Sequence, residues 1–211
     1  MTRSANLKAA NDENWRAAIR HRFVNELLDG TLDDKVLAAY LVQDYQFFDA
    51  FVALLGQACA SAPTLAARMR YAAQLGMLAS DEDTYFTDTF DALGVPDQDR
   101  THPELRTPTR EFEAIMREAT ASRSYTQVLA VLVVAEWLYL DWGSRADDGM
   151  TATRPEHVRW IDLHRGPEFA AWVEFLRAEF DAARGTDDAA AEALFARAVA
   201  AEVAFFDAAY T

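Results

Sequence analysis

The segment from Tyr125 to Trp142, YTQVLAVLVVAEWLYLDW, constrains the fold more than any other part of the chain. Its apolar side chains would lie on every side of a helix, and Gly143 directly follows as a typical helix end. The uncharged run within it, residues 125–135, is only about half as long as a membrane span. A helix that is apolar all round must be covered by other helices, so we predict a buried central helix at residues 125–142.

The rest of the chain has apolar residues spaced three and four apart, interrupted by only 8 Gly and 6 Pro. No long stretch alternates between apolar and polar residues, so strands are not predicted. We therefore expect an all-α protein, with residues 1–211 forming a single domain of about seven or eight helices around the central one. The predicted helices span residues 4–28, 34–61, 64–92, 108–121, 125–142, 154–163, about 167–183 and 187–210.

The charge and the cysteine usage limit the partners of the chain. Twenty Lys and Arg residues against 34 Asp and Glu residues give a formal net charge of −14. This charge repels phosphate backbones and anionic lipid surfaces, so neither a nucleic acid nor a membrane is an expected partner. Cys59 is the only cysteine, which excludes an intramolecular disulfide and a cysteine-based metal site. Because no secretory signal is recognisable either, we expect a cytoplasmic protein.

Three carboxylic acids interrupt apolar helix faces: Asp44, Glu136 and Glu202. The residues three, four and seven positions away from each are mostly leucine, valine, tyrosine and phenylalanine. Burial of an unpaired carboxylate is costly, so each acid must be hydrogen-bonded, protonated or exposed to a polar cavity. We expect all three to face one cavity. The alternative, in which each is a core acid satisfied by a tyrosine or an arginine, stays open.

Buried carboxyl groups around one cavity would suit general acid–base catalysis, because burial raises one pKa while a hydrogen-bonded neighbour stays ionised. Nearby aromatic residues such as Tyr45 and Tyr139 offer hydroxyls and flat faces, which favours a protonatable heteroaromatic amine as the ligand. A di-iron carboxylate site needs a Glu and a His three residues apart on facing helices, and no such pair lies on an apolar face here. We therefore expect no metal ion and no cofactor.

Four short stretches and one acid carry a family signature. The stretches are HRFV at residues 21–24, DGTL at 29–32, YLVQD at 40–44 and WLYLDWG at 137–143, and the acid is Glu202 in the last helix. Together they resemble the TenA/thiaminase II family of heme-oxygenase-like helical proteins. The resemblance covers essentially the whole chain, and it implies a heme-oxygenase-like bundle.

Carried over residue by residue, the resemblance implies a site for an aminopyrimidine. Asp44 matches the aspartate that hydrogen-bonds the pyrimidine, Tyr139 matches a tyrosine that orients the reacting groups, and Glu202 matches the acid/base near the leaving group. The implied substrate-binding set is completed by Trp137 and by three residues that replace family tyrosines, namely Phe47, Phe112 and His164.

The nucleophilic cysteine of the family is expected two residues before Trp137, where this sequence has Ala135. Cys59 cannot replace that cysteine, because it lies about 22 Å along the predicted helix from Asp44. The chain therefore resembles a branch of the family that lacks the cysteine and acts on pyrimidine salvage intermediates. In such a branch Glu136 and Glu202 would activate a water instead of a thiol.

The resemblance thus implies a hydrolase of thiamine salvage that removes the aminomethyl nitrogen from a 4-amino-5-aminomethyl-2-methylpyrimidine-type substrate. It also implies a homo-oligomer, either a tetramer or a dimer. Two alternatives remain open. One is a non-catalytic pyrimidine-binding or regulatory protein of the same fold, and the other is a di-iron oxidase of that fold.

Overall fold

The computed structural model describes residues 2–183 and 187–211. Within these two ranges the regular structure is helical and contains no strand, which confirms the predicted all-α class. A π-helical turn (Leu78–Glu82) joins α5 to α6, and a short 3-10 turn (Ser144–Asp148) follows α9. The α-helices are α1 (Arg3–Ala10), α2 (Asp12–Ile19), α3 (Arg22–Asp29), α4 (Asp34–Ser61), α5 (Leu65–Met77), α6 (Asp83–Ala92), α7 (Asp97–Thr101), α8 (Thr107–Ser122), α9 (Tyr125–Gly143), α10 (Pro155–Leu163), α11 (Gly166–Ala182) and α12 (Asp188–Ala208).

Helix α9 is the centre of the bundle. It packs against α12, α11, α4 and α8, and α2 also touches it. The seven consecutive residues 128–134 are each 0% exposed. Each fully buried leucine or valine of this run stabilises the fold by roughly 1.5–3 kcal/mol. The prediction of a buried central helix is therefore confirmed.

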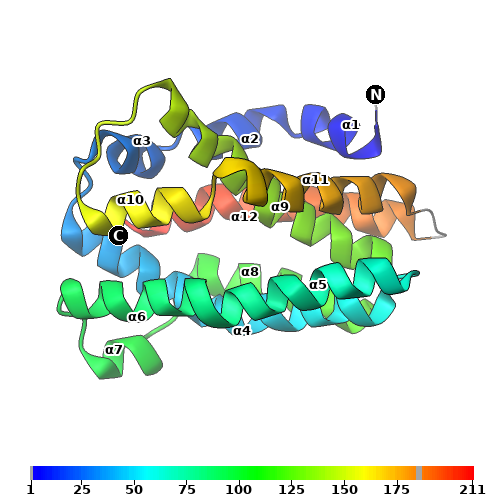
Figure 1. The fold of residues 1–211 in the computed structure, drawn as a ribbon, viewed down its shortest axis with the longest axis horizontal. Coiled ribbons are helices and arrows are strands. Elements are labelled where there is room, and N and C mark those ends of the chain that lie inside the picture. The colour runs from blue at the N-terminus through cyan, green and yellow to red at the C-terminus, as the bar shows by residue number, and fades with distance from the viewer. Residues whose placement is uncertain (1, 184–186) are drawn as a thin grey trace.

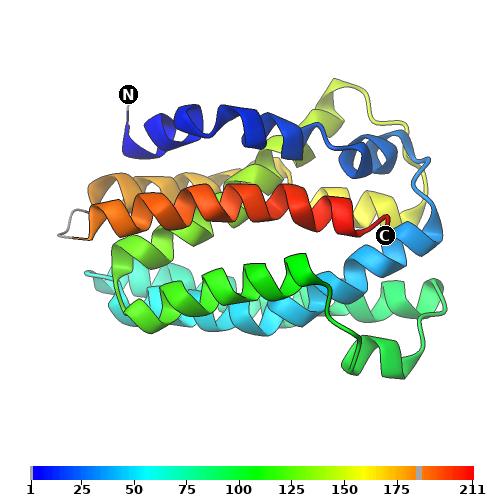
Figure 2. The same ribbon diagram turned by 180° about the vertical axis from the view of Figure 1, so that it is seen from behind.

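The other helices surround α9 in layers. In Figure 1, α1 to α3 lie along the top, α4 to α8 lie along the bottom, and α9 to α12 fill the space between them. Figure 2 shows from behind that α12 runs through the middle of the molecule. This arrangement places the middle turns of α4, α9 and α12 around one interior region. Among the described residues, no helix is long and apolar enough to cross a membrane.

Local capping explains why two long helices begin where the sequence predicts. Asp33 accepts a hydrogen bond from the Lys35 amide at 2.8 Å, which starts α4. Ser124 accepts one from the Gln127 amide at 3.2 Å, which starts α9. Gly30 ends α3 in the left-handed conformation with a φ of 74°, which only glycine adopts at little cost.

The prediction of one helix over residues 4–28 is wrong, because the chain forms α1, α2 and α3 there. Asn11 leaves the helical conformation with ψ of 22° and separates α1 from α2. His21 separates α2 from α3, and its Nδ1 accepts a hydrogen bond from the Phe23 amide at 3.1 Å. Neither break contains the glycine or proline that marks helix ends elsewhere in this chain, so apolar spacing alone could not locate them.

Candidate active site

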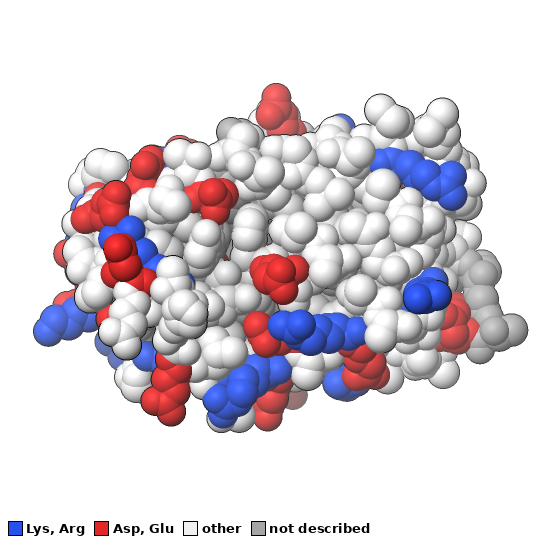
Figure 3. All heavy atoms as spheres, turned by 90° about the horizontal axis from the view of Figure 1, so that it is seen from below, with Lys and Arg blue, Asp and Glu red and all other residues white. Residues whose placement is uncertain are grey.

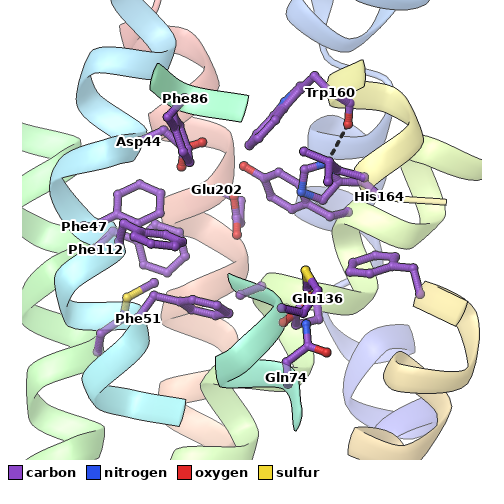
Figure 4. A pocket seen from close by; sticks show the side chains of 17 residues that line it. Asp44, Phe47, Phe51, Gln74, Phe86, Phe112, Glu136, Trp160, His164 and Glu202 are labelled. Atoms are coloured by element: carbon purple, nitrogen blue, oxygen red, sulfur yellow. Dashed lines mark hydrogen bonds between the residues drawn. The ribbon is translucent and has the colours of Figure 1, made fainter. Parts of the chain in front are cut away.

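One cavity lies in the middle of the bundle, bordered by α4, α5, α6, α8, α9, α10, α11 and α12 (Figure 4). Its empty volume is about 660 Å³, including the part that reaches solvent. Most of its wall is aromatic or apolar, and few polar groups interrupt it. The lining residues are Asp44, Phe47, Phe48, Phe51, Gln74, Met77, Phe86, Phe112, Met116, Ala135, Glu136, Tyr139, Trp160, Leu163, His164, Phe169 and Glu202.

The three acids that interrupt apolar helix faces all line this cavity. Asp44 comes from α4, Glu136 from α9 and Glu202 from α12. They are 6%, 7% and 1% exposed, so all three are buried. In Figure 4, Glu202 lies between the wall that carries Asp44 and the wall that carries His164. Within the described ranges, none of the three acids forms an ion pair with an arginine or a lysine. Three carboxyl groups therefore face one cavity without a cationic partner among the described residues.

Asp44 and Glu202 influence each other electrostatically. Burial raises the pKa of both carboxyls well above their usual range, and the negative charge of Asp44 raises the pKa of Glu202 further. A hydrogen bond from Tyr40 partly offsets the shift at Asp44 by lowering its pKa. The Oε2 atom of Glu202 is buried and has no hydrogen-bond partner among the described residues. The pair therefore favours retaining a proton until a cationic ligand enters the cavity.

Glu136 has a different environment. Its Oε1 accepts a hydrogen bond from the indole nitrogen of Trp172 at 2.8 Å. Burial raises the pKa of Glu136 to about 7, and the bond from Trp172 works in the opposite direction. A carboxyl with this pKa exchanges its proton readily at neutral pH, which is what a general base requires.

His164 lines the cavity as a neutral ring. Burial lowers the pKa of the imidazole to about 4. Its Nδ1 lies 2.8 Å from the carbonyl oxygen of Trp160, so Nδ1 carries the proton and Nε2 is the acceptor. The Tyr139 ring packs against the imidazole with centroids 4.8 Å apart. His164 thus offers the cavity an acceptor where a tyrosine would offer a hydroxyl.

The remaining predicted positions divide into lining and non-lining residues. Phe47 and Phe112 line the cavity with ring centroids 5.4 Å apart, and they form part of its flat wall. Ala135 lines it too, so the position at which the family resemblance led us to expect a cysteine faces this space. Tyr45 lies outside the lining, and its hydroxyl donates to Asp83 at 3.0 Å.

Trp137 does not line the cavity, so the structure does not support its expected role in substrate binding. Its indole lies between the side chains of two cations, with Lys8 4.4 Å and Arg177 3.9 Å from the ring centroid. It also meets the edge of Trp15, with centroids 5.3 Å apart. One residue along a helix turns the side chain by about 100°, and this rotation directs Trp137 away from the face that carries Glu136.

Two residues that the sequence did not single out contribute directly to the site. Trp172 donates a hydrogen bond to Glu136. Gln74 contributes its amide group to the cavity wall (Figure 4). Trp172 lies 36 residues from Glu136 in the sequence. No local spacing could have indicated that pair, although an unexplained buried acid does predict that some donor lies nearby.

Other chemical groups lie away from the cavity. Cys59 is half-buried, and its Sγ contacts the carbonyl oxygen of Arg68 at 3.5 Å. In the part of the chain that the structure describes, no group of three or more His, Cys, Asp or Glu residues is arranged to hold a metal ion.

The arrangement matches a known family. A sequence profile of the TENA/THI-4/PQQC family matches residues 8–211. The chain belongs to this family. The match covers nearly every residue, including the helices that carry Asp44, Glu136 and Glu202, so the predicted family resemblance is confirmed.

The individual proteins that this chain resembles have low sequence identity to it. The aminopyrimidine aminohydrolase of Bacillus subtilis (strain 168) is 24% identical over 181 residues, covering 84% of this chain and 75% of that relative. A TenA family transcription regulator from a Silicibacter species has a TM-score of 0.87 and 22% identity, with 98% and 96% of the two chains covered. A domain of unknown function with a heme oxygenase-like fold from Shewanella denitrificans has a TM-score of 0.72 and 15% identity, with 98% and 91% covered. These likenesses confirm the heme-oxygenase-like fold.

Proposed function

We propose that this chain is an aminopyrimidine aminohydrolase of thiamine salvage that acts without a nucleophilic cysteine. The observation that carries the proposal is the convergence of Asp44, Glu136 and Glu202 on one ring-lined cavity. Such a cavity suits a flat, nitrogen-rich and protonatable molecule, because each acid can pair with a ring nitrogen or an amino group. Membership of the TENA/THI-4/PQQC family and the 24% identity to the Bacillus subtilis aminopyrimidine aminohydrolase both support the choice of substrate class.

In the proposed complex Asp44 holds the aminopyrimidine ring. The aromatic wall of Phe47 and Phe112 stacks against the ring, and His164 accepts a hydrogen bond at its edge through Nε2. Tyr139 orients the reacting groups. Binding of a cationic ring compensates the buried charge of Asp44, so the ligand and the ionised carboxylate stabilise each other.

The proposed reaction replaces a carbon–nitrogen bond by a carbon–oxygen bond. Water attacks the methylene carbon of the aminomethyl group, Glu136 takes a proton from that water, and ammonia leaves with a proton supplied by Glu202. The products are the hydroxymethylpyrimidine and ammonia, so atoms and charge balance. The pKa of about 7 at Glu136 and the strongly raised pKa of Glu202 fit a base and an acid, respectively.

Ammonia release tests this proposal directly. Purified protein mixed with 4-amino-5-aminomethyl-2-methylpyrimidine should release ammonia, and Glu202→Gln should abolish the release while the circular dichroism spectrum stays unchanged. Glu192→Gln is the matched control, because Glu192 lies on the same helix with its side chain 52% exposed. The absence of ammonia at millimolar substrate would exclude the proposed hydrolysis.

Ala135 favours one second candidate, a protein that binds a pyrimidine without converting it. The cavity and its acids are intact, whereas the position of the family cysteine holds a methyl group. In that case the aminopyrimidine should raise the melting temperature and no ammonia should appear. Thermal shift and ammonia assays on the same sample therefore separate the two candidates.

We also propose that residues 1–211 form a single domain and that the protein is cytoplasmic.

We propose further that the protein forms a homodimer or a homotetramer. Leu65 and Met69 on α5 support self-association, since they are 71% and 62% exposed. Figure 3 shows that the face seen from below has a broad uncharged area, with most charged side chains toward one end and one edge. Light scattering of the wild type and of Leu65→Glu would measure the oligomeric state, and a monomeric wild type would exclude the oligomer.

A further inference from the structure

We propose that Trp172 is the positioning residue for Glu136, and that its indole N–H fixes one carboxyl oxygen so that the other is available to the cavity. This inference rests on the proposed role of Glu136 as the base. The donor and the acceptor are both buried, with Trp172 2% and Glu136 7% exposed. The Nε1 to Oε1 distance is 2.8 Å, which is normal for a strong N–H···O bond to a carboxylate.

Trp172 is itself held rigidly. The ring of Tyr71 on α5 meets it edge-on with centroids 5.8 Å apart, and Phe175 stacks at 5.6 Å. The Tyr71 hydroxyl lies 2.8 Å from the Tyr125 hydroxyl, which in turn donates to Glu179 Oε2 at 2.6 Å. Side chains from α5, α9 and α11 thus fix the indole plane, so the N–H direction is set before any ligand binds.

The consequence for Glu136 is a defined orientation. With Oε1 occupied by Trp172, Oε2 has no hydrogen-bond partner among the described residues and remains free for a water or a ligand. The N–H also favours the ionised form, since it donates to the carboxylate. Both effects serve a base, which must be correctly aimed and able to lose its proton at neutral pH.

Not every buried indole N–H in the described part of this chain has a hydrogen-bond partner. The Nε1 atoms of Trp142 and Trp160 are buried too, and within the described ranges neither has a hydrogen-bond partner. Trp15, in contrast, donates to a carboxylate that is outside the cavity, Asp141, at 2.8 Å. Trp15 therefore provides a control in which the same kind of bond can be removed without touching the site.

Kinetics of Trp172→Phe and Trp15→Phe separate positioning from packing. Both substitutions shrink a buried indole and delete one N–H bond to a carboxylate. We expect Trp172→Phe to lower kcat roughly 10- to 100-fold with little change in KM, and to move the acid limb of the pH–rate profile upward by about one pH unit. Trp15→Phe should leave both values near wild type. Equal effects of the two substitutions, or an unchanged profile in Trp172→Phe, would overturn the proposal.

A second measurement does not depend on activity or on the folding of a Trp172 variant. In a ¹H–¹⁵N spectrum of the wild type, the indole N–H signal of Trp172 should titrate with the pKa of Glu136. The other ionisable groups that face Glu136 across the cavity are Asp44, Tyr139, His164 and Glu202, so Glu136→Gln identifies the titrating group by removing the response.

The two measurements keep the two proposals distinguishable. A titrating Trp172 signal without ammonia release would exclude the hydrolase and retain the contact with Glu136. A signal that does not titrate, or one that still titrates in Glu136→Gln, would show that Trp172 does not control this carboxyl.

Discussion

The hydroxyls of Tyr40 on α4 and Tyr139 on α9 lie 2.6 Å apart, and this hydrogen bond links the two helices beside the acids. Tyr139 lines the cavity, whereas Tyr40 is 1% exposed and lies behind it. Tyr40 also bonds Asp44, and the bond lowers the pKa of that carboxyl against the effect of burial. A phenol outside the lining therefore lowers the pKa of an acid inside it, against the larger effect of burial.

Removal of this phenol should weaken ligand binding. Tyr40→Phe deletes the donor to Asp44, so the pKa of Asp44 rises further and the ionised form becomes rarer. We expect the Kd of the aminopyrimidine to increase about five- to tenfold, as measured by titration calorimetry. Tyr210→Phe is the matched control, since it deletes a phenol donor to a different carboxylate, Glu26, outside the cavity. Equal losses in both variants would contradict the role of Tyr40.

Glu136 should make the stability of the protein depend on pH. Its pKa is about 7 in the folded chain against an ordinary value of 4.5, so the folded state retains a proton that the unfolded state releases. Stability therefore falls as pH rises from about 4.5 to about 7. Glu136→Gln removes this dependence and should be more stable than wild type at pH 8 by about 3 kcal/mol, with a gap that closes toward pH 4.5.

Urea unfolding at several pH values measures the effect of Glu136. Glu111→Gln is a suitable control, because Glu111 is exposed on α8 and should show no such change. A Glu136→Gln curve that runs parallel to wild type at all pH values would mean that Glu136 is not the buried titrating group.

A cysteine at position 135 should react inside the cavity. In a Cys59→Ala background, Ala135→Cys should be alkylated by iodoacetamide, and bound aminopyrimidine should slow the alkylation at least tenfold. Cys59 in the wild type should react at the same rate with and without the ligand, since it lies away from the cavity. Mass spectrometry after timed quenching measures both rates. Alkylation of Ala135→Cys that the ligand does not slow would place position 135 outside the binding site.

Trp137→Phe should reduce stability and leave ligand affinity unchanged. The indole contacts Lys8, Arg177 and Trp15 and does not line the cavity. We expect a loss of about 1–2 kcal/mol in the free energy of unfolding from the weaker cation–π and ring contacts. A change in Kd larger than about twofold, measured by calorimetry, would indicate that Trp137 takes part in binding.

Much of the fold could be predicted because helix bounds depend mainly on local signals. Asp33 and Gly30 determine the start of α4 and the end of α3, and both are visible in the sequence. The breaks at Asn11 and His21 were missed, because they depend on cap geometry formed without glycine or proline. The turn at residues 78–82 also interrupts a pattern that reads as one helix over 64–92.

The site residues that could be predicted are the acids that lie on an otherwise apolar face of their helix. Asp44, Glu136 and Glu202 stand out because an acid in an apolar stripe needs an explanation. The partners of these acids do not stand out: Trp172 is an ordinary buried aromatic residue until the structure places it beside Glu136. Trp137 was expected at the site from its position in a motif, whereas the structure places its side chain outside the cavity lining.

Ala135 and Glu136 are adjacent in sequence, yet both reach the same ligand space. Neighbouring residues point about 100° apart on a helix, so the cavity must wrap around more than a quarter of the circumference of α9. A ring bound in the cavity can therefore contact two successive side chains of α9. In the proposed hydrolase, the carboxyl of Glu136 therefore reaches the same ligand space that a thiol at position 135 would reach.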